Sequence, residues 1–140
     1  MSEDNKAIAR RFYSELVNQG DLSLADKLVV EDFVDHNPPG PDIAPGREGL
    51  KQVFSTFRSA FPDMRMTIED QVAEGDKVVS RATASGTHLG DFMGIPATGK
   101  SFSMGIIDIL RFEDGKIAER WGEADFMGLM QQLGVVPTPG

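Results

Sequence analysis

Asp108 is the acidic residue whose surroundings in the sequence best suit chemistry. It lies in a stretch, Phe102 to Phe112, whose alternating pattern is typical of a β-strand. Its face of that strand is the more apolar one and also carries Phe102, Met104, Ile106, Leu110 and Phe112. An ionised carboxylate in such surroundings is costly, so we expect either a partner or a raised pKa. The pattern fits equally a catalytic acid or base and a structural aspartate bonded to a backbone amide or an arginine.

The next predicted strand, from Ile117 to Ala124, adds further acidic side chains. Strict alternation places on one of its faces Ile117, Glu119, Trp121, Glu123 and, just beyond its end, Asp125. The pair Asp114-Gly115 is typical of a two-residue hairpin turn, which places Asp108 opposite Trp121. The acidic residues on this face are then predicted to surround Asp108, and clustered carboxylates suit general acid/base catalysis. Glu119, close to the turn, fits better as a solvated residue at the sheet edge.

Two histidines and one arginine complete the candidate polar residues. His36 and His88 stand where a predicted strand meets a loop, a position more typical of surface or capping residues than of catalysts. There is no helical His-x-x-x-His spacing and no dense ligand cluster, so a metal site is not expected. Arg81 alternates with Val79 and Thr83, which leaves open whether it enters a pocket to orient a carboxylate or faces solvent. The chain has neither cysteine nor a Gly-x-Ser-x-Gly motif, which excludes a catalytic thiol and the usual nucleophilic serine.

The elements that must position these residues are helices first and strands afterwards. Helical periodicity predicts helices over Asp4–Asn18, Asp21–Val29, Arg47–Phe61 and Phe126–Leu133. A short extended piece is predicted at Phe33–Gly40, and an antiparallel meander follows with strands from Met64, over Val78–His88, Phe102–Phe112 and Ile117–Ala124. This order indicates an α+β fold. A parallel nucleotide-binding sheet is excluded, because the chain lacks a glycine-rich phosphate loop and strand–helix alternation.

Length and charge narrow the possible partners and location. The chain has 140 residues, which fits one domain over 1–140. A formal charge of −8 argues against binding to nucleic acid or an anionic membrane. The longest apolar runs are far shorter than the roughly 20 residues of a membrane-spanning helix. The polar, acidic start does not suit a secretory signal, so we expect a cytoplasmic protein.

Short motifs along nearly the whole chain match the pattern of one known family. They are Arg11-Phe12-Tyr13, Asn18-Gln19-Gly20-Asp21, Phe33-Val34-Asp35-His36, Gly49-Leu50-Lys51, Phe61-Pro62-Asp63, Gly86-Thr87-His88, Gly94-Ile95-Pro96-Ala97-Thr98-Gly99, Ile107-Asp108-Ile109, Arg111-Phe112-Glu113-Asp114-Gly115-Lys116-Ile117, and Glu119-Arg120-Trp121 with Asp125. As a set they resemble the SnoaL-like polyketide cyclase family, in the NTF2-like superfamily that also contains ketosteroid isomerase and limonene epoxide hydrolase. The set is specific for the family and much less specific for a reaction.

The resemblance implies a cone-shaped α+β barrel, in which a curved antiparallel sheet packs on N-terminal helices around one pocket. It also implies a homodimer. A sheet with helices on one face leaves its other face to be covered, and Ile107 and Ile109 would lie there.

For activity, the resemblance implies ring closure by intramolecular aldol condensation on a polyketide ester, without metal or cofactor. The family uses an acidic residue near the end of the chain. That position corresponds to Asp125, with Glu123 as a rival, and His36 and Asp108 resemble other pocket positions.

We therefore expect an acid/base catalyst, an aldol-type cyclase or related isomerase, acting on a small apolar or polyketide-like carbonyl compound. The predicted catalytic residues are Asp125, Asp108 and His36. The predicted substrate-binding residues are His88, Glu123, Trp121, Arg81, Phe12 and Phe57. Two alternatives stay open: a module that binds a hydrophobic ligand without turnover, and an epoxide hydrolase in which Arg81, Asp108 and Asp125 activate water. The hydrolase requires Arg81 to point inward.

Overall fold

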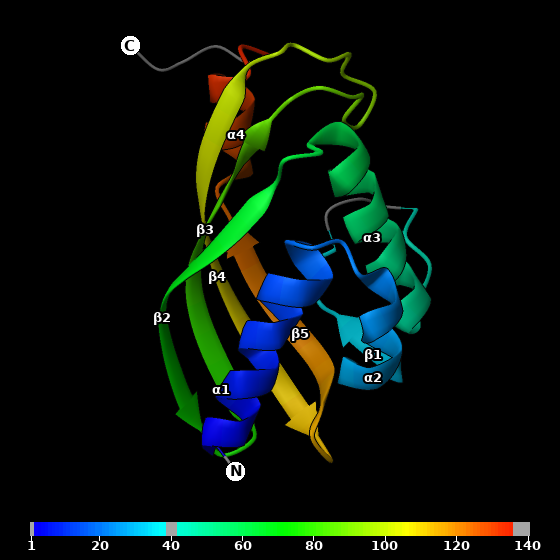
Figure 1. Cartoon of the computed structure of the whole chain (residues 1–140), viewed down its shortest axis with the longest axis vertical. Helices are drawn as coiled ribbons and strands as arrows, with labels where there is room; N and C mark the ends of the chain where they lie inside the picture. Colours follow the sequence, from blue (N-terminus) through cyan, green and yellow to red (C-terminus); the bar gives the residue numbers. More distant parts are fainter. Residues whose placement is uncertain (1, 39–41, 136–140) are drawn as a thin grey trace.

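The computed structural model describes residues 2–38 and 42–135, which form helices around one sheet (Figure 1). The helical elements are α1 (Ser2–Arg11), η1 (a π-helix, Phe12–Val17), η2 (a 3-10 helix, Leu22–Leu24), α2 (Ala25–Leu28), α3 (Gly46–Ala60) and α4 (Phe126–Gln132). The strands are β1 (Val29–Asp35), β2 (Arg65–Glu74), β3 (Lys77–Thr87), β4 (Ser101–Glu113) and β5 (Lys116–Ala124). The predicted α+β fold class is confirmed. None of the helices in the described part is long and apolar enough to cross a membrane.

The five strands form one curved, open sheet in the order β1-β5-β4-β3-β2. Strands β2 to β5 pair antiparallel, which confirms the predicted meander, and β1 adds parallel to β5. The turn between β4 and β5 has φ of 51° at Asp114 and 78° at Gly115, as a two-residue hairpin turn requires. Val29, which periodicity assigns to the second helix, begins β1 instead, because β-branched Val29 and Val30 favour extended backbone and Val29 pairs with Ile117.

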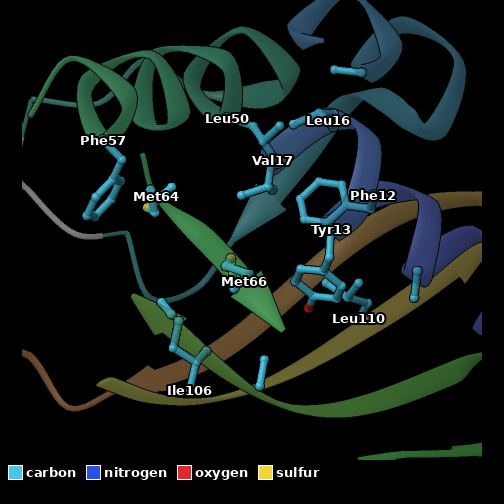
Figure 2. Packing of buried hydrophobic residues seen from close by; sticks show 14 of the residues in the cluster. Phe12, Tyr13, Leu16, Val17, Leu50, Phe57, Met64, Met66, Ile106 and Leu110 are labelled. Carbon is cyan, nitrogen blue, oxygen red and sulfur yellow. The ribbon is translucent and has the colours of Figure 1, made fainter. Parts of the chain in front are cut away.

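The helices α1 and α3 cover one face of the sheet, which is called the inner face here (Figure 1). The burial of β4 alternates along its length, and its buried residues are Phe102, Met104, Ile106, Asp108, Leu110 and Phe112. From α3, Leu50 and Phe57 pack toward this face (Figure 2). Burial of one large apolar side chain is worth about 1.5–3 kcal/mol, so this pattern strongly specifies which side of β4 faces the helices.

The π-helical turn η1 continues α1 and aims its side chains at the core. Four of its residues, Phe12, Tyr13, Leu16 and Val17, are buried. Such wide turns are rare and occur frequently at functional sites. Here the turn carries Tyr13 over the middle of the inner face, where its hydroxyl contacts Asp108 of β4.

A bulge near the start of β5 decides which of its side chains face the helices. Ile117 pairs with Phe112, whereas the next matched pair joins Glu119 to Arg111. Ala118 is therefore an extra residue without a partner on β4. Beyond a bulge the alternation of side chains is inverted relative to the residues before it.

This inversion corrects the predicted surroundings of Asp108. Asp108 pairs with Gly122, and Trp121 pairs with Ile109, so the predicted pairing of Asp108 with Trp121 is wrong by one residue. Arg120 therefore shares the inner face with Asp108, and Trp121 lies on the opposite face with Ile109. Strict alternation counted from Ile117 failed because it contains no allowance for the extra residue.

Candidate functional site

A cavity of about 330 Å³ lies between the inner face of the sheet and the helices. Its walls are mostly apolar and include Phe12, Phe33, Leu50, Phe57, Met66 and Ile106. Figure 2 shows five of these side chains, drawn from η1, α3, β2 and β4. The volume is at the lower end of the range for small-molecule sites. Of the predicted substrate-binding residues, Phe12 and Phe57 are in this lining.

Asp108 is the acidic side chain that β4 presents to the cavity, and it is only 4% exposed. The Tyr13 hydroxyl donates a hydrogen bond to its Oδ2 at 2.8 Å. Arg120 donates from Nε to its Oδ1 at 3.1 Å, and Arg120 Nη2 lies 2.9 Å from the same oxygen. The partner that an inward carboxylate requires is thus an arginine on the neighbouring strand together with a tyrosine.

Arg120 also binds a second carboxylate at the end of β1. Its Nη1 donates to Asp35 Oδ1 at 2.9 Å and to Asp35 Oδ2 at 3.0 Å. Burial by itself opposes the charge of Arg120, but the charges of Asp108 and then Asp35 raise its pKa above the usual value. The guanidinium therefore stays protonated between the two carboxyl groups.

Backbone contacts hold this set in place. Asn37 Oδ1 accepts a hydrogen bond from the Gly122 amide at 3.0 Å, and the Asn37 amide donates to Asp35 Oδ1 at 2.9 Å. A Cβ atom at Gly122 would collide with Arg120 Nη2 and Asp108 Oδ1. Glycine at this position is therefore what allows the guanidinium and the carboxylate to lie directly over β5.

Further buried polar side chains extend the hydrogen-bond network from Tyr13 across the sheet. Ser80, on β3 opposite Asp108, hydrogen-bonds the Tyr13 hydroxyl and accepts from Gln71 Nε2 at 3.2 Å. Burial, followed by the negative charge of Asp108, raises the pKa of Tyr13 well above its usual value of 10.0. Tyr13 therefore stays neutral and keeps its proton as a donor toward Asp108.

Tyrosine ionisation is expected to be suppressed in the folded protein. Tyr13 is the only tyrosine, so absorbance at 295 nm reports it alone. Because its folded pKa is raised, its contribution to the free energy of unfolding is complete below pH 10 and is lost as the pH rises above 10. We expect no tyrosinate signal near pH 10 until the chain unfolds, and a normal titration of the chain in denaturant. A folded protein that titrates near pH 10 would contradict the placement of this hydroxyl.

Asp125, the expected acid/base, lies outside the lining of this cavity. It is exposed and caps α4, where its Oδ1 accepts from the Gly128 amide at 2.9 Å. The expectation that Asp108 and Asp125 share one cavity is therefore wrong. β5 ends at Ala124, and the chain turns into α4 at Asp125, so this carboxylate is used by the first turn of the helix.

Five other predicted site residues also lie outside the cavity lining. His36 stacks on Trp121 with ring centroids 4.7 Å apart, and its Nε2 lies 2.7 Å from Glu119 Oε2. Glu123 is exposed and borders a separate, more open hollow. Arg81 is exposed on the outer face, which removes the hydrolase arrangement that required it to point inward.

The fifth of these residues, His88, is fully buried but belongs to the packing of a loop. Its Nδ1 accepts from the Thr98 amide at 3.2 Å, and its ring lies 5.5 Å from that of Phe61. Within residues 2–38 and 42–135, no group of three or more His, Cys, Asp or Glu side chains is arranged to hold a metal ion.

Three residues of the site were missed as site residues: Tyr13, Asp35 and Arg120. The sequence did contain an indication of Arg120, because an inward carboxylate needs a cation. Arg120 lies on the adjacent strand, and a change of one residue in the register turns it inward. For Asp35 and Tyr13 the only indication was that they occur in the family motifs, since nothing in local periodicity links them to Asp108.

The comparisons with known proteins agree with this fold. The model of the SnoaL-like polyketide cyclase family matches residues 7–133. Aklanonic acid methyl ester cyclase DnrD of Streptomyces peucetius is 32% identical over 108 residues, which cover 76% of this chain and 72% of that protein. Nogalonic acid methyl ester cyclase of Streptomyces nogalater is 27% identical over 118 residues, covering 84% and 88% of the two chains.

The solved structure of a related protein has the same fold. TsrD from Streptomyces laurentii superposes with a TM-score of 0.88 at 35% sequence identity, covering 97% of this chain and 98% of that one. The family model covers nearly the whole chain, and the curated relatives are ring-closing enzymes. This chain therefore belongs to the SnoaL-like polyketide cyclase family.

Proposed function

We propose that this protein closes a ring in a polyketide ester by intramolecular aldol condensation, with Asp108 as the base. The observation that carries the proposal is the position of Asp108: a carboxylate inside an apolar cavity, with a tyrosine and an arginine as its donors. The relatives named as methyl ester cyclases support the reaction class.

In the proposed reaction, Asp108 removes a proton from a carbon adjacent to a carbonyl group. The resulting enolate carbon attacks a second carbonyl of the same molecule, and a carbon–carbon bond forms while the second carbonyl becomes an alkoxide. The alkoxide takes the proton back from Asp108, so the product is an isomer of the substrate and no cofactor is consumed.

The neighbours of Asp108 assist at the moment when charge moves. While Asp108 is ionised, Tyr13 and Arg120 donate to it. Once the carboxyl holds the substrate proton, it is neutral and accepts hydrogen bonds less strongly. Tyr13 and Arg120 can then donate hydrogen bonds to the developing oxyanion. Asp35 holds part of the charge of Arg120, which keeps Arg120 from fully neutralising Asp108.

Ring closure should be measured directly on aklanonic acid methyl ester and nogalonic acid methyl ester. In ordinary water we expect a product with the mass of the substrate and a new retention time. In D₂O, substrate recovered before cyclisation is complete should carry deuterium at the carbon that loses its proton. Bound but unchanged ester would instead favour a module that holds a hydrophobic ligand without turnover.

A second candidate, epoxide hydration, is favoured by one observation: the Asp35–Arg120–Asp108 set places two carboxylates on one guanidinium. One carboxylate would take a proton from water as the water attacks an epoxide carbon, and a protonated carboxyl would supply a proton to the departing oxygen. Incubation of an apolar epoxide in ¹⁸O-water distinguishes the two reactions, since only hydration incorporates a labelled oxygen, and the product then gains about 20 mass units.

A further inference from the structure

A row of polar side chains crosses the buried inner face of the sheet. Gln71 of β2 pairs with Ser80 of β3, and Ser80 pairs with Asp108 of β4. These three residues are 9%, 1% and 4% exposed, respectively. Gln71 and Ser80 lie outside the cavity lining, so a substrate in the cavity would not contact them. Their burial needs another reason, because a polar group in an apolar core costs free energy unless its hydrogen bonds are made.

A bulge in β2 turns Gln71 toward this face. Ile68 and Asp70 pair with consecutive residues of β3, so Glu69 is an extra residue on β2. Beyond Glu69 the alternation of side chains is inverted, and Gln71 faces the helices instead of solvent. The other inward residues of β3 are apolar, so packing alone would favour an apolar side chain at position 80.

The hydrogen bonds of this row all run toward Asp108. Gln71 Nε2 can only donate, and it donates to Ser80 Oγ at 3.2 Å. The single proton of Ser80 is therefore directed to its other neighbour, the Tyr13 hydroxyl. Tyr13, which points from η1 toward the sheet (Figure 2), in turn donates to Asp108 Oδ2 at 2.8 Å. If Tyr13 donated to Ser80 instead, the Ser80 proton would have no acceptor, because Gln71 presents an amide N–H to it.

Two further observations agree with this direction. Burial and then the charge of Asp108 raise the pKa of Tyr13, whereas the Ser80 hydrogen bond acts to lower it, as a bond donated to the tyrosine oxygen does. Gln71 Oε1 has no hydrogen-bond partner among residues 2–38 and 42–135, so in this row Gln71 acts only as a donor.

We propose that Ser80, held by Gln71, is a positioning residue that keeps the Tyr13 proton on the cavity side and strengthens Tyr13 as a donor. A hydroxyl that accepts a hydrogen bond donates more strongly, because successive hydrogen bonds polarise one another. This inference rests on the proposed ring closure, in which Tyr13 donates first to Asp108 and then to the developing oxyanion.

The first test is the kinetics of ring closure in Ser80→Ala, Gln71→Met and the double variant. Ser80→Ala should lower kcat about fivefold, the factor for one modest hydrogen bond, with KM within about twofold of the wild type. Gln71→Met should cause a smaller loss alone and none in the Ser80→Ala background, because Gln71 reaches Tyr13 only through Ser80. The matched control, Ser85→Ala, makes the same change on the opposite face of β3 and should leave kcat unchanged.

Melting curves separate this positioning role from a structural one. The double variant Ser80→Ala/Gln71→Met replaces both polar partners by apolar side chains, a change that is nearly neutral or stabilising. It should therefore melt at or above the wild-type temperature although its kcat is lowered. A purely structural role would instead lower the melting temperature and kcat together, which would contradict the proposal.

A nuclear magnetic resonance experiment tests the contact without turnover. Tyr13 is the only tyrosine, so a ¹³C label at its Cζ atom gives one resonance. Ser80→Ala removes the donor to the tyrosine oxygen and should move this resonance, whereas Ser85→Ala should not. An unmoved resonance, or additive losses of kcat in the double variant, would overturn the proposal.

The two proposals fail in different ways. A wild type that closes no ring contradicts the proposed function, and the positioning role with it. A wild type that closes the ring while Ser80→Ala keeps its full kcat contradicts the positioning role alone.

Discussion

Replacement of Asp108 by asparagine is expected to lower kcat for ring closure by about a hundredfold or more, because removing a positioned general base typically costs that much. The amide has the shape of the carboxyl and can still accept from Arg120, but it cannot take a proton at neutral pH. The apolar walls of the cavity are untouched and asparagine has nearly the same volume, so KM should stay within about threefold of the wild type. Exchange of the substrate proton in D₂O should be lost together with ring closure.

Asp125→Asn is the matched control for this experiment. It makes the same chemical change on an exposed carboxylate that caps α4, and asparagine caps helices about as well as aspartate. We expect activity within about twofold of the wild type and an unchanged melting temperature. If Asp125→Asn abolishes turnover and Asp108→Asn does not, the base is Asp125 and the proposal for Asp108 is wrong.

Replacement of Arg120 by methionine is expected to have the largest effect on stability. Arg120 is one-fifth exposed and lies between Asp108, which is buried, and Asp35. Without its positive charge, two carboxylates face each other beside an apolar cavity, and a buried charge left without its partner costs about 3–5 kcal/mol. Chemical denaturation should show a loss of that size, and the melting temperature should fall by roughly 10 °C or more.

The control is Arg65→Met, which removes an arginine that is exposed on β2. Its effect should stay within about 0.5 kcal/mol, as for most surface substitutions. The double variant Arg120→Met/Asp108→Asn should recover part of the loss, because one of the unpaired carboxylates is gone. If Arg120→Met is as stable as Arg65→Met, the arginine does not balance the buried carboxylate.

Much of the framework followed from local patterns. The period of two in β4 correctly placed Asp108 on the buried face, and of the two expectations for a buried carboxylate, a partner or a raised pKa, the structure shows the partner. The helix predicted over Arg47–Phe61 is α3, Gly46–Ala60, and the Asp114-Gly115 turn is where it was expected. Such features are encoded within a few neighbouring residues, by side-chain periodicity and by turn conformations that need positive φ.

The sequence by itself thus determined most of the helices and strands, the inward face of β4 and the family, whereas the tertiary structure decided which groups meet Asp108. Tyr13 lies 95 residues from it along the chain, and Asp35 lies 85 residues from Arg120. The single extra residue at Ala118 turned Arg120 inward and Trp121 outward. No local pattern marks that bulge, because it depends on how two strands pair, and pairing is settled by burial over the whole sheet.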